Sequence, residues 1–238
     1  MPDIKVKNLT VTYIDKKKNE TVAVRGLSAR FGAGTLNVVM GFSGCGKTTL
    51  LKAIAGFFAF DGYIYFDGRD ADTIPTRKRN LAYVSQDYVL YPSLTVFDNI
   101  AFPLKTARLK RDEVTERVKA IAETFGLTDC LTRLPKHLSG GQQQRVAIAR
   151  AMVKHPNLIL MDEPLSNVDT ESREMLRRYI RHVQTSEGVT VIYVTHDYRE
   201  ALELADRIYV MDEGQLVFEG TPDEVRMSEN ETVALLRQ

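Results

Sequence analysis

The segment 41–48, with the sequence GFSGCGKT, has residue types and a spacing suited to binding phosphate groups. It matches the pattern G-x-x-x-x-G-K-[ST] and lies between a run that predicts a strand and a stretch that predicts a helix. Its glycines let successive backbone N–H groups turn toward an anion. Lys47 supplies a positive charge, and Thr48 offers an oxygen to a hard cation such as Mg²⁺. The segment therefore predicts a nucleotide-binding loop, whose contact residues would be Gly41, Ser43, Gly44, Cys45, Gly46, Lys47, Thr48 and Thr49.

Two carboxylates and a histidine follow predicted strands later in the chain. Asp162 and Glu163 come directly after the apolar run 158–161, and His196 follows the run 189–194. An aspartate at a strand tip can bind Mg²⁺ directly or through water, and a neighbouring glutamate can polarise an attacking water molecule. A histidine at a strand end can hydrogen-bond a terminal phosphate. We therefore expect Asp162 to hold the metal, and Glu163 and His196 to take part in the reaction.

A second motif suited to binding an anion lies far from the first along the chain. Ser139, Gly140 and Gly141 open a predicted helix that runs from Gln142 to about Lys154. The first backbone N–H groups of a helix are free, and the helix dipole is positive at that end, so an anion is attracted there. Because one loop suffices to hold one nucleotide, this second site needs a separate role.

The composition excludes several classes of protein. Of the 238 residues, 32 are Lys or Arg and 31 are Asp or Glu, and the net charge of +1 gives no reason to expect nucleic-acid binding. The two cysteines, Cys45 and Cys130, lack metal-ligand spacing and predict no disulfide framework. The N-terminus is charged where a signal peptide would be apolar, and the apolar runs fall short of the ~20 residues that span a bilayer. We expect a soluble, cytosolic chain that reaches a membrane only through a partner.

The hydrophobic pattern predicts one α/β domain, 1–238. Strands are predicted at 4–13, 22–31, 36–40, 63–66, 81–84, 158–161, 189–194 and 208–211. Helices are predicted at 48–57, 114–125 and 142–154, after Asp169, and over the tail 221–238. This alternation predicts a mainly parallel central sheet, with an antiparallel β layer at the N-terminus. Because no strong strand interrupts 91–155, we expect a catalytic core of 1–86 and 156–238 and an inserted α-helical subdomain, 87–155.

Taken together, these motifs closely resemble those of the ATPase subunit of ATP-binding cassette (ABC) transporters, which have the P-loop NTPase fold. The resemblance covers the chain from about Ile4 to Leu236. It implies that ATP and Mg²⁺ are bound, that Tyr13 stacks on adenine, and that Gln86 reaches both Mg²⁺ and the attacking water. The remaining implied roles are Mg²⁺ ligands at Thr48 and Asp162, catalytic groups at Lys47, Glu163 and His196, the signature motif at Ser139, Gly140 and Gly141, and a dimer-seam loop at 166–169.

The resemblance also gives the second anion site a role. In this family two ATPase subunits meet head to tail and enclose two ATP molecules, so the signature motif of one subunit serves the nucleotide of the other. The residues implied to act in trans are Ser139, Gly140, Gly141, Gln142 and Asp169. The seam loop has Asn167 and Val168 where relatives often have Ala and Leu, and the effect of these two residues on coupling stays open.

The segments 88–104 and 214–222 resemble importer ATPases of the sugar, polyamine and anion groups, above all the maltose type. This implies an integral membrane permease, whose coupling helix the first segment receives, and an extracytoplasmic solute-binding protein. It also implies a peripheral location at the cytoplasmic face of the membrane. Because the chain stops at Gln238, we expect no C-terminal regulatory domain of the maltose type. The transported compound stays open, as does the choice between a homodimer and a close paralogue.

Three alternative functions stay open. The first is a soluble ABC ATPase that acts on DNA or ribosomes, which the single cassette and the near-neutral charge disfavour. The second is an exporter ATPase, although the segment 134–137 lacks the acidic-glycine motif typical of exporters. The third is a scaffold without hydrolysis, against which Glu163 and His196 argue. Co-purification with a membrane permease would support the transport ATPase, and co-purification with nucleic acid or ribosomes would support the soluble alternative.

Overall fold

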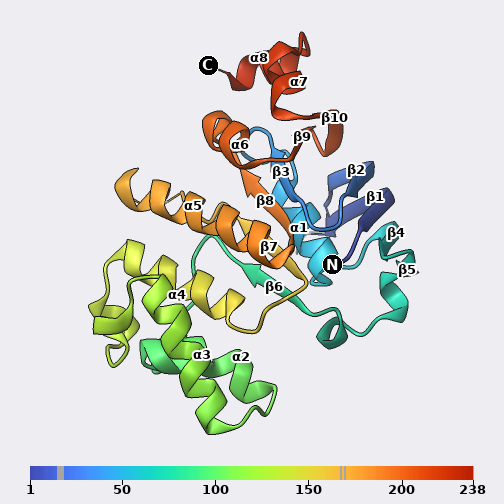
Figure 1. Ribbon diagram of the computed structural model, residues 1–238. Helices are drawn as coiled ribbons and strands as arrows, with labels where there is room; N and C mark the ends of the chain where they lie inside the picture. Colours follow the sequence, from blue (N-terminus) through green and yellow to red (C-terminus); the bar gives the residue numbers. More distant parts are fainter. Residues whose placement is uncertain (15–18, 167, 169, 238) are drawn as a thin grey trace.

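The chain forms two β-sheets with helices packed around them (Figure 1). The computed structural model describes residues 1–14, 19–166, 168 and 170–237. Within the described part of the chain, no helix is both long enough and apolar enough to cross a lipid bilayer.

The larger sheet has six strands and is mainly parallel, as the sequence predicts. In spatial order its strands are β10 (Gln215–Gly220), β9 (Arg207–Asp212), β3 (Leu36–Met40), β8 (Thr190–Thr195), β7 (Leu158–Asp162) and β6 (Leu81–Val84). All neighbours pair in parallel except β10, which pairs with β9 in the antiparallel direction and had not been predicted as a strand. Parallel strands share a direction, so the carboxyl ends of β3, β6, β7 and β8 meet at one edge of the sheet. The four predicted functional segments follow these four ends.

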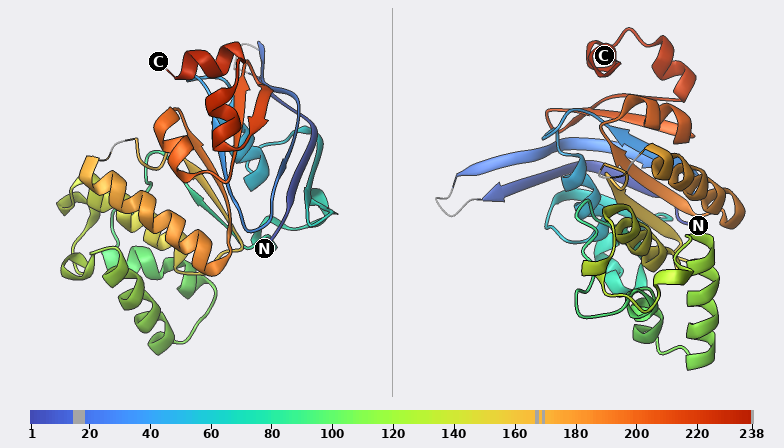
Figure 2. Two further views of the ribbon diagram at one scale, coloured as in Figure 1. Left: turned by 45° about the horizontal axis from the view of Figure 1, so that its top comes forward. Right: turned by 90° about the vertical axis from the view of Figure 1, so that its left-hand side faces the viewer.

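The smaller sheet is antiparallel and packs on one face of the larger one. Its strands are, in spatial order, β2 (Glu20–Phe31), β1 (Ile4–Ile14), β4 (Asp61–Phe66) and β5 (Arg69–Asp70). The apolar alternation of β1 changes phase near Asn8 in the sequence, and the structure shows why: the register with β2 shifts between Val6 and Leu9, and Asn8 has a φ of 50°. In Figure 2 the two long strands β1 and β2 project together beyond the rest of the molecule.

The central strands are buried on both faces, which explains their continuous apolar sequences. In β7, Leu158 and Leu160 pack with the antiparallel sheet, whereas Ile159 and Met161 pack with the helices on the opposite face. Helix α1 (Lys47–Ala55) lies between the two sheets and contacts β1, β2, β7 and β8. It ends two residues before the predicted boundary.

Three helices and two short 3₁₀ turns occupy the middle of the chain. They are α2 (Val96–Thr106), α3 (Arg111–Thr124), η3 (Thr128–Cys130), η4 (Pro135–His137) and α4 (Gly140–Met152). Figures 1 and 2 show α2, α3 and α4 together beside β6, on the side away from the antiparallel sheet. The helix predicted to start at Gln142 is α4, which begins two residues earlier, at Gly140, because Ser139 is its N-cap.

The remaining α-helices lie in the C-terminal part of the chain, after β7. They are α5 (Thr170–Glu187), α6 (Tyr198–Leu204), α7 (Pro222–Met227) and α8 (Glu231–Leu236), and two 3₁₀ turns, η1 (Ala71–Thr73) and η2 (Thr76–Lys78), lie earlier in the chain. The prediction of one closing helix over 221–238 was wrong. The backbone becomes extended at Ser228, with a ψ of 136°, and Asn230 caps a new helix by accepting a hydrogen bond from the Val233 N–H at 3.2 Å.

The junction before α2 depends on one buried amide. Asn99 is fully buried, and its Nδ2 donates to the carbonyls of Tyr91, Leu94 and Thr95 at 3.0–3.1 Å. Its Oδ1 accepts from the N–H of Tyr91 at 2.8 Å. The turn over 91–95 therefore owes its shape to this one side chain.

We predict that Asn99→Ala lowers the free energy of unfolding by about 2–4 kcal/mol, because it leaves buried backbone groups without partners. The midpoint of urea unfolding, followed by circular dichroism, measures this change. The control is Thr106→Ala in the same helix, where an exposed hydroxyl makes a single bond to the Phe102 carbonyl and a change within about 0.5 kcal/mol is expected. Equal effects of the two substitutions would contradict the role given to Asn99.

Candidate functional site

A cavity of about 740 Å³ lies at the edge where the parallel strands end. Segments that are far apart in the sequence meet around it: the phosphate loop, the ends of β6, β7 and β8, the antiparallel hairpin and α8. The residues that line it are Tyr13, Thr21, Ala23, Gly41, Phe42, Ser43, Gly44, Gly46, Lys47, Thr48, Thr49, Gln86, Glu163, His196, Leu235 and Leu236. The structure thus brings most of the sequence-predicted site residues to one place.

Lys47 places a buried positive charge at the floor of this cavity. Its side chain is 4% exposed, and its Nζ donates to the carbonyls of Gly41 and Phe42, each at 2.8 Å. None of the ion pairs formed by the described residues includes Lys47. The third donor of the ammonium meets only the weak sulfur acceptor of Cys45, 3.8 Å away, which an incoming oxygen can replace. A buried cation without a carboxylate partner favours an anionic ligand.

Cys45, a predicted contact residue of the phosphate loop, is not among the residues that line the cavity. Its side chain is buried, with its Sγ 3.8 Å from the Nζ of Lys47. Burial raises the pKa of the Cys45 thiol above its ordinary value, and the nearby positive charge of Lys47 opposes that shift. The thiol therefore faces the interior of the loop.

Asp162 and Thr48 form a pair of oxygen donors beside the cavity. The Oγ1 of Thr48 donates to the Oδ1 of Asp162 at 2.8 Å, across the gap between α1 and β7. The Asp162 carboxylate is 3% exposed and belongs to none of the ion pairs among the described residues. A buried carboxylate without a cation, bonded to a hydroxyl whose oxygen can also bind a metal, fits a hard cation.

The oxygens of Thr48 and Asp162 suit a metal ion that phosphate and water also coordinate. The described residues contain no group of three or more His, Cys, Asp and Glu side chains that could hold a metal ion by themselves. Mg²⁺ needs few protein ligands, because phosphate and water oxygens complete its coordination in nucleotide sites. The residues present therefore fit Mg²⁺ that arrives with a phosphate ligand, and not a closed structural metal site.

Glu163 and His196 meet at the mouth of the cavity. The Oε2 of Glu163 lies 3.0 Å from the Nδ1 of His196. The backbone of Glu163 has a φ of 45°, and its N–H donates to the Val194 carbonyl at 3.0 Å, next to the strand that ends before His196. The carboxylate is partly buried whereas the imidazole is more than half exposed. A carboxylate and an imidazole held together in this way can accept and relay a proton.

Tyr13 lies at the opposite end of the cavity. It comes from β1 and is 37% exposed, and its hydroxyl lies 3.0 Å from the Oγ1 of Thr49. Its ring meets the ring of Phe58 edge to face, with centroids 5.2 Å apart. These contacts hold one edge of the ring and leave aromatic surface at the cavity for a planar group.

The second anion motif does not line this cavity. Ser139 and Gln142 form a capping box: the Ser139 Oγ accepts from the Gln142 N–H at 3.2 Å, and the Gln142 side chain accepts from the Ser139 N–H at 3.0 Å. Within the described hydrogen bonds, none uses the N–H groups of Gly140 and Gly141. Gly140 is exposed and Gly141 is half-buried at the positive end of α4, where their N–H groups can bind an anion from outside the chain. The predicted seam residues Asn167 and Asp169 lie outside the described residues.

Sequence reasoning missed several residues of the cavity wall. Leu235 and Leu236 come from α8, Thr21 and Ala23 come from β2, and Phe42 belongs to the loop itself. No spacing or residue type marks them, because their place depends on how distant segments pack. A split of the predicted closing helix at Asn230, a residue typical of helix N-caps, is the one signal that could have located α8.

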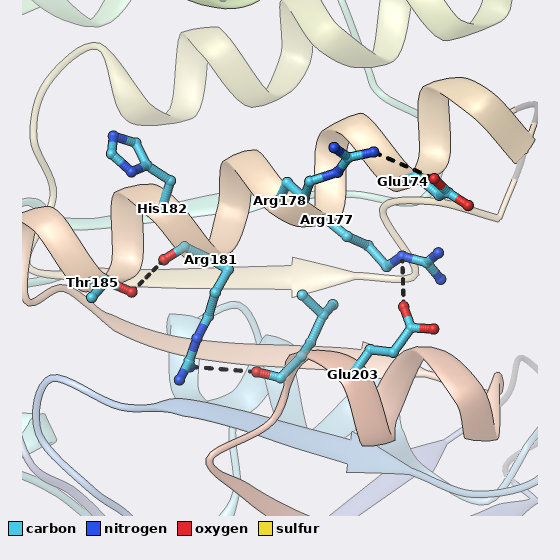
Figure 3. A pocket seen from close by; sticks show the side chains of 8 residues that line it. Glu174, Arg177, Arg178, Arg181, His182, Thr185 and Glu203 are labelled. Carbon is cyan, nitrogen blue, oxygen red and sulfur yellow. Dashed lines mark hydrogen bonds and ion pairs between the residues drawn. The ribbon is translucent and has the colours of Figure 1, made fainter.

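A second cavity, also of about 740 Å³, lies between α5 and α6 (Figure 3). Figure 3 shows its arginine side chains directed toward acidic or backbone partners. Arg177 pairs with Glu203 at 3.2 Å, and Arg178 pairs with Glu174 at 3.4 Å. Because these charges already have partners and no glycine-rich loop is present, this cavity lacks the features of a phosphate site.

Comparisons with known proteins agree with this geometry. The ABC transporter family model matches residues 24–166. The chain is 47% identical, over 213 residues, to the trehalose/maltose import ATP-binding protein MalK of Thermococcus litoralis, covering 87% of this chain and 57% of that protein. It is 44% identical, over 218 residues, to the spermidine/putrescine import ATP-binding protein PotA of Hahella chejuensis, covering 91% and 60%. The chain thus spans about three-fifths of the length of these curated relatives.

A solved structure supports the same assignment. The model is similar to the dimeric ATP-binding cassette MJ0796 in a post-hydrolysis state bound to ADP and Pi, with a TM-score of 0.85 and 30% identity. The match covers 92% of this chain and 98% of that one. Fold, site and sequence agree, and the chain belongs to the ABC transporter family of ATP-binding proteins.

Proposed function

We propose that this chain is the ATP-hydrolysing subunit of an ABC importer. Two subunits, identical or closely paralogous, enclose two MgATP molecules and drive an integral membrane permease. The observation that carries this proposal is the cavity lined by the phosphate loop and the Glu163–His196 pair, in which Thr48 is bonded to the buried Asp162. The relatives named above are import ATP-binding proteins, which supports the direction of transport.

The proposed reaction is the attack of water on the terminal phosphorus of ATP, which breaks the bond to the bridging oxygen and releases ADP and phosphate. Lys47 and the loop N–H groups hold the outer phosphates in place. Mg²⁺ bound beside Thr48 and Asp162 would neutralise charge on those phosphates. Gln86, on the cavity wall, orients the attacking water and reaches the metal.

Glu163 and His196 are the other two catalytic residues in this proposal. Glu163 accepts the proton of the attacking water, since its carboxylate faces the cavity. His196 contacts the terminal phosphate with the ring edge opposite its Nδ1, which the 3.0 Å bond to Glu163 holds in place. At the other end, Tyr13 stacks on the adenine ring, with Leu235 and Leu236 as apolar neighbours.

The proposed dimer supplies what one chain lacks. The free N–H groups of Gly140 and Gly141, with Ser139 and Gln142, bind the terminal phosphate held by the other subunit, and Asp169 lies at the seam. Their position outside the cavity of their own chain supports this role. In this proposal 87–155 forms the signature-bearing helical subdomain, and 1–86 with 156–238 forms the catalytic core.

The permease would dock on the segment that follows Gln86. Here Tyr91 and Phe102 expose about two-fifths of their side chains, with ring centroids 4.5 Å apart, and Val89 is more exposed still. An aromatic surface of this kind suits a helix of an integral membrane subunit. The chain would thus act at the cytoplasmic face of the membrane, with an extracytoplasmic binding protein delivering the solute.

The test of this function is reconstitution with the permease subunits that co-purify with the tagged chain from solubilised membranes. We expect MgATP-dependent uptake of solute into proteoliposomes and phosphate release that rises steeply with the concentration of the chain. Co-purification with ribosomes or DNA in place of membrane subunits would favour the soluble alternative. Solute moving out of vesicles toward the side opposite the ATPase would favour an exporter.

We predict that Glu163→Gln binds MgATP with near wild-type affinity but lowers kcat by about 100-fold or more, because an amide cannot accept the proton of the attacking water. Phosphate release measures the rate, and size-exclusion chromatography with ATP should show a stable dimer. The matched control is Glu187→Gln, since Glu187 also pairs with a histidine, His155 at 3.1 Å, and neither lines the cavity. Hydrolysis near the wild-type rate in Glu163→Gln would remove that carboxylate from its role.

We predict that Ser139→Arg leaves nucleotide binding to isolated subunits intact but abolishes the hydrolysis that depends on subunit association, because a bulky cation blocks the start of α4. Fluorescent-ATP titration and phosphate release measure the two effects. Thr221→Arg is the control, because Thr221 caps α7 with the same capping box and either variant loses about 1 kcal/mol of cap stability. Loss of ATP binding by single Ser139→Arg subunits would contradict a role in trans.

We predict that Cys45 is alkylated slowly at neutral pH, because its thiol is buried and burial raises its pKa. The thiolate is the reactive form, so the rate should rise about tenfold per pH unit until the raised pKa is reached. Labelling a Cys130→Ser variant isolates this thiol, and mass spectrometry follows it. Bound MgATP should slow labelling, and labelled protein should lose activity. Full activity after complete labelling would show that the loop tolerates the added group.

A further inference from the structure

The Asp162 carboxylate is held from two sides by hydroxyl groups, and only one of these belongs to the phosphate loop. Thr48 donates to Oδ1 at 2.8 Å, whereas Tyr83 donates through its phenol to Oδ2 at 2.9 Å. Together these are the side-chain hydrogen bonds that the described residues make to this carboxylate. Sequence reasoning identified Thr48 and did not identify Tyr83.

The fold places Tyr83 for this contact. It lies in β6, which pairs in parallel with β7, and it stands opposite Leu160, two residues before Asp162. The edge-to-face contact between the rings of Phe57 and Tyr83, with centroids 5.3 Å apart, restricts the tyrosine. A phenol is protonated at neutral pH and a carboxylate only accepts, so Tyr83 is the donor in this bond.

Tyr83 is not among the residues that line the nucleotide cavity, and its hydroxyl is bonded to Asp162, so it contacts the site through that carboxylate. It acts on the orientation of the carboxylate. With Oδ2 tied to the phenol, Oδ1 faces Thr48 and receives the hydroxyl proton of that residue. The lone pairs of Thr48 Oγ1 are then free to face the cavity, which is the orientation that a cation requires.

We propose that Tyr83 is a positioning residue for the metal site, which fixes the Asp162 carboxylate so that Thr48 and Asp162 together present their oxygens to Mg²⁺. This inference rests on the proposed MgATP-binding function and names a residue of that site which no motif includes. It follows that the phenol hydroxyl sets the affinity for the metal and leaves the affinity for the nucleotide alone unchanged.

The experiment compares Tyr83→Phe with the wild type, since this change removes one oxygen and keeps the ring. A fluorescent ATP analogue is titrated with excess Mg²⁺ and again with EDTA. We expect equal affinities in EDTA, and in Tyr83→Phe about tenfold less gain in affinity from Mg²⁺. The Mg²⁺ concentration for half-maximal phosphate release should rise by a similar factor, with kcat at saturating Mg²⁺ changed less.

A matched control separates this role from the general effect of deleting a buried phenol. Tyr209 in β9 also donates its hydroxyl to a partner, the Arg30 carbonyl, and lies outside the cavity. Tyr209→Phe should leave the gain in affinity from Mg²⁺ at the wild-type value. Thermal unfolding without nucleotide shows that both variants are folded. An equal loss in both variants would overturn the proposal.

The outcomes also separate this inference from the proposed function. If wild-type protein binds the ATP analogue and gains affinity from Mg²⁺, and Tyr83→Phe gains as much, Tyr83 has no positioning role and the function stands. If the wild-type protein binds no ATP analogue under either condition, the proposed function itself fails. Weaker binding of Tyr83→Phe in EDTA as well as in Mg²⁺ would assign Tyr83 to the shape of the pocket and would overturn the proposal.

Discussion

The phosphate loop depends on backbone segments that approach it more closely than any side chain would allow. A Cβ atom at Gly41 would overlap the carbonyl oxygen of Met211, and one at Gly46 would overlap that of Ala23. Both glycines have positive φ values, 153° and 103°. The loop is thereby fixed between the end of β9 and strand β2, so the two sheets meet around it. Its N–H groups keep their direction without a ligand, which is the preorganisation that phosphate binding requires.

In the phosphate loop the positive φ values belong to glycines, whereas after Gln86 they belong to residues with side chains. Tyr88 and Val89 have φ values of 59° and 25°, which are unfavourable for residues with side chains. Arg150, near the end of α4, donates to the carbonyls of both, at 3.3 and 3.0 Å, and lies over the ring of Tyr91. A shift of α4 would therefore move this segment. Under the proposed function, the helix that begins at the signature motif is joined by its last turn to the surface that the permease would contact.

The features that could be predicted from the sequence are those that depend on residues close together in the chain. The parallel strands were predictable because burial on both faces makes them apolar throughout, and the shift near Asn8 was visible as a change in alternation. The phosphate loop and the strand-end residues were predictable because each motif lies within a few residues. The wall formed by Leu235 and Leu236 was not, because it depends on the packing of α8 against distant strands. The Tyr83–Asp162 hydrogen bond could not be predicted, because it depends on β6 lying beside β7, and no local sequence pattern shows which strands are neighbours.

Within one chain, the phosphate loop and the start of α4 do not line the same cavity, so they cannot bind the same phosphate group. Lys47 lies at the floor of the cavity, whereas the free N–H groups of Gly140 and Gly141 start a helix that does not line it. Under the proposed function, the terminal phosphate held by another subunit would accept from these two donors, and such charge-assisted hydrogen bonds are roughly twice as strong as neutral ones. Association of two such chains would therefore be stabilised by the charge of the bound nucleotide. Loss of the terminal phosphate would remove that stabilisation at the seam.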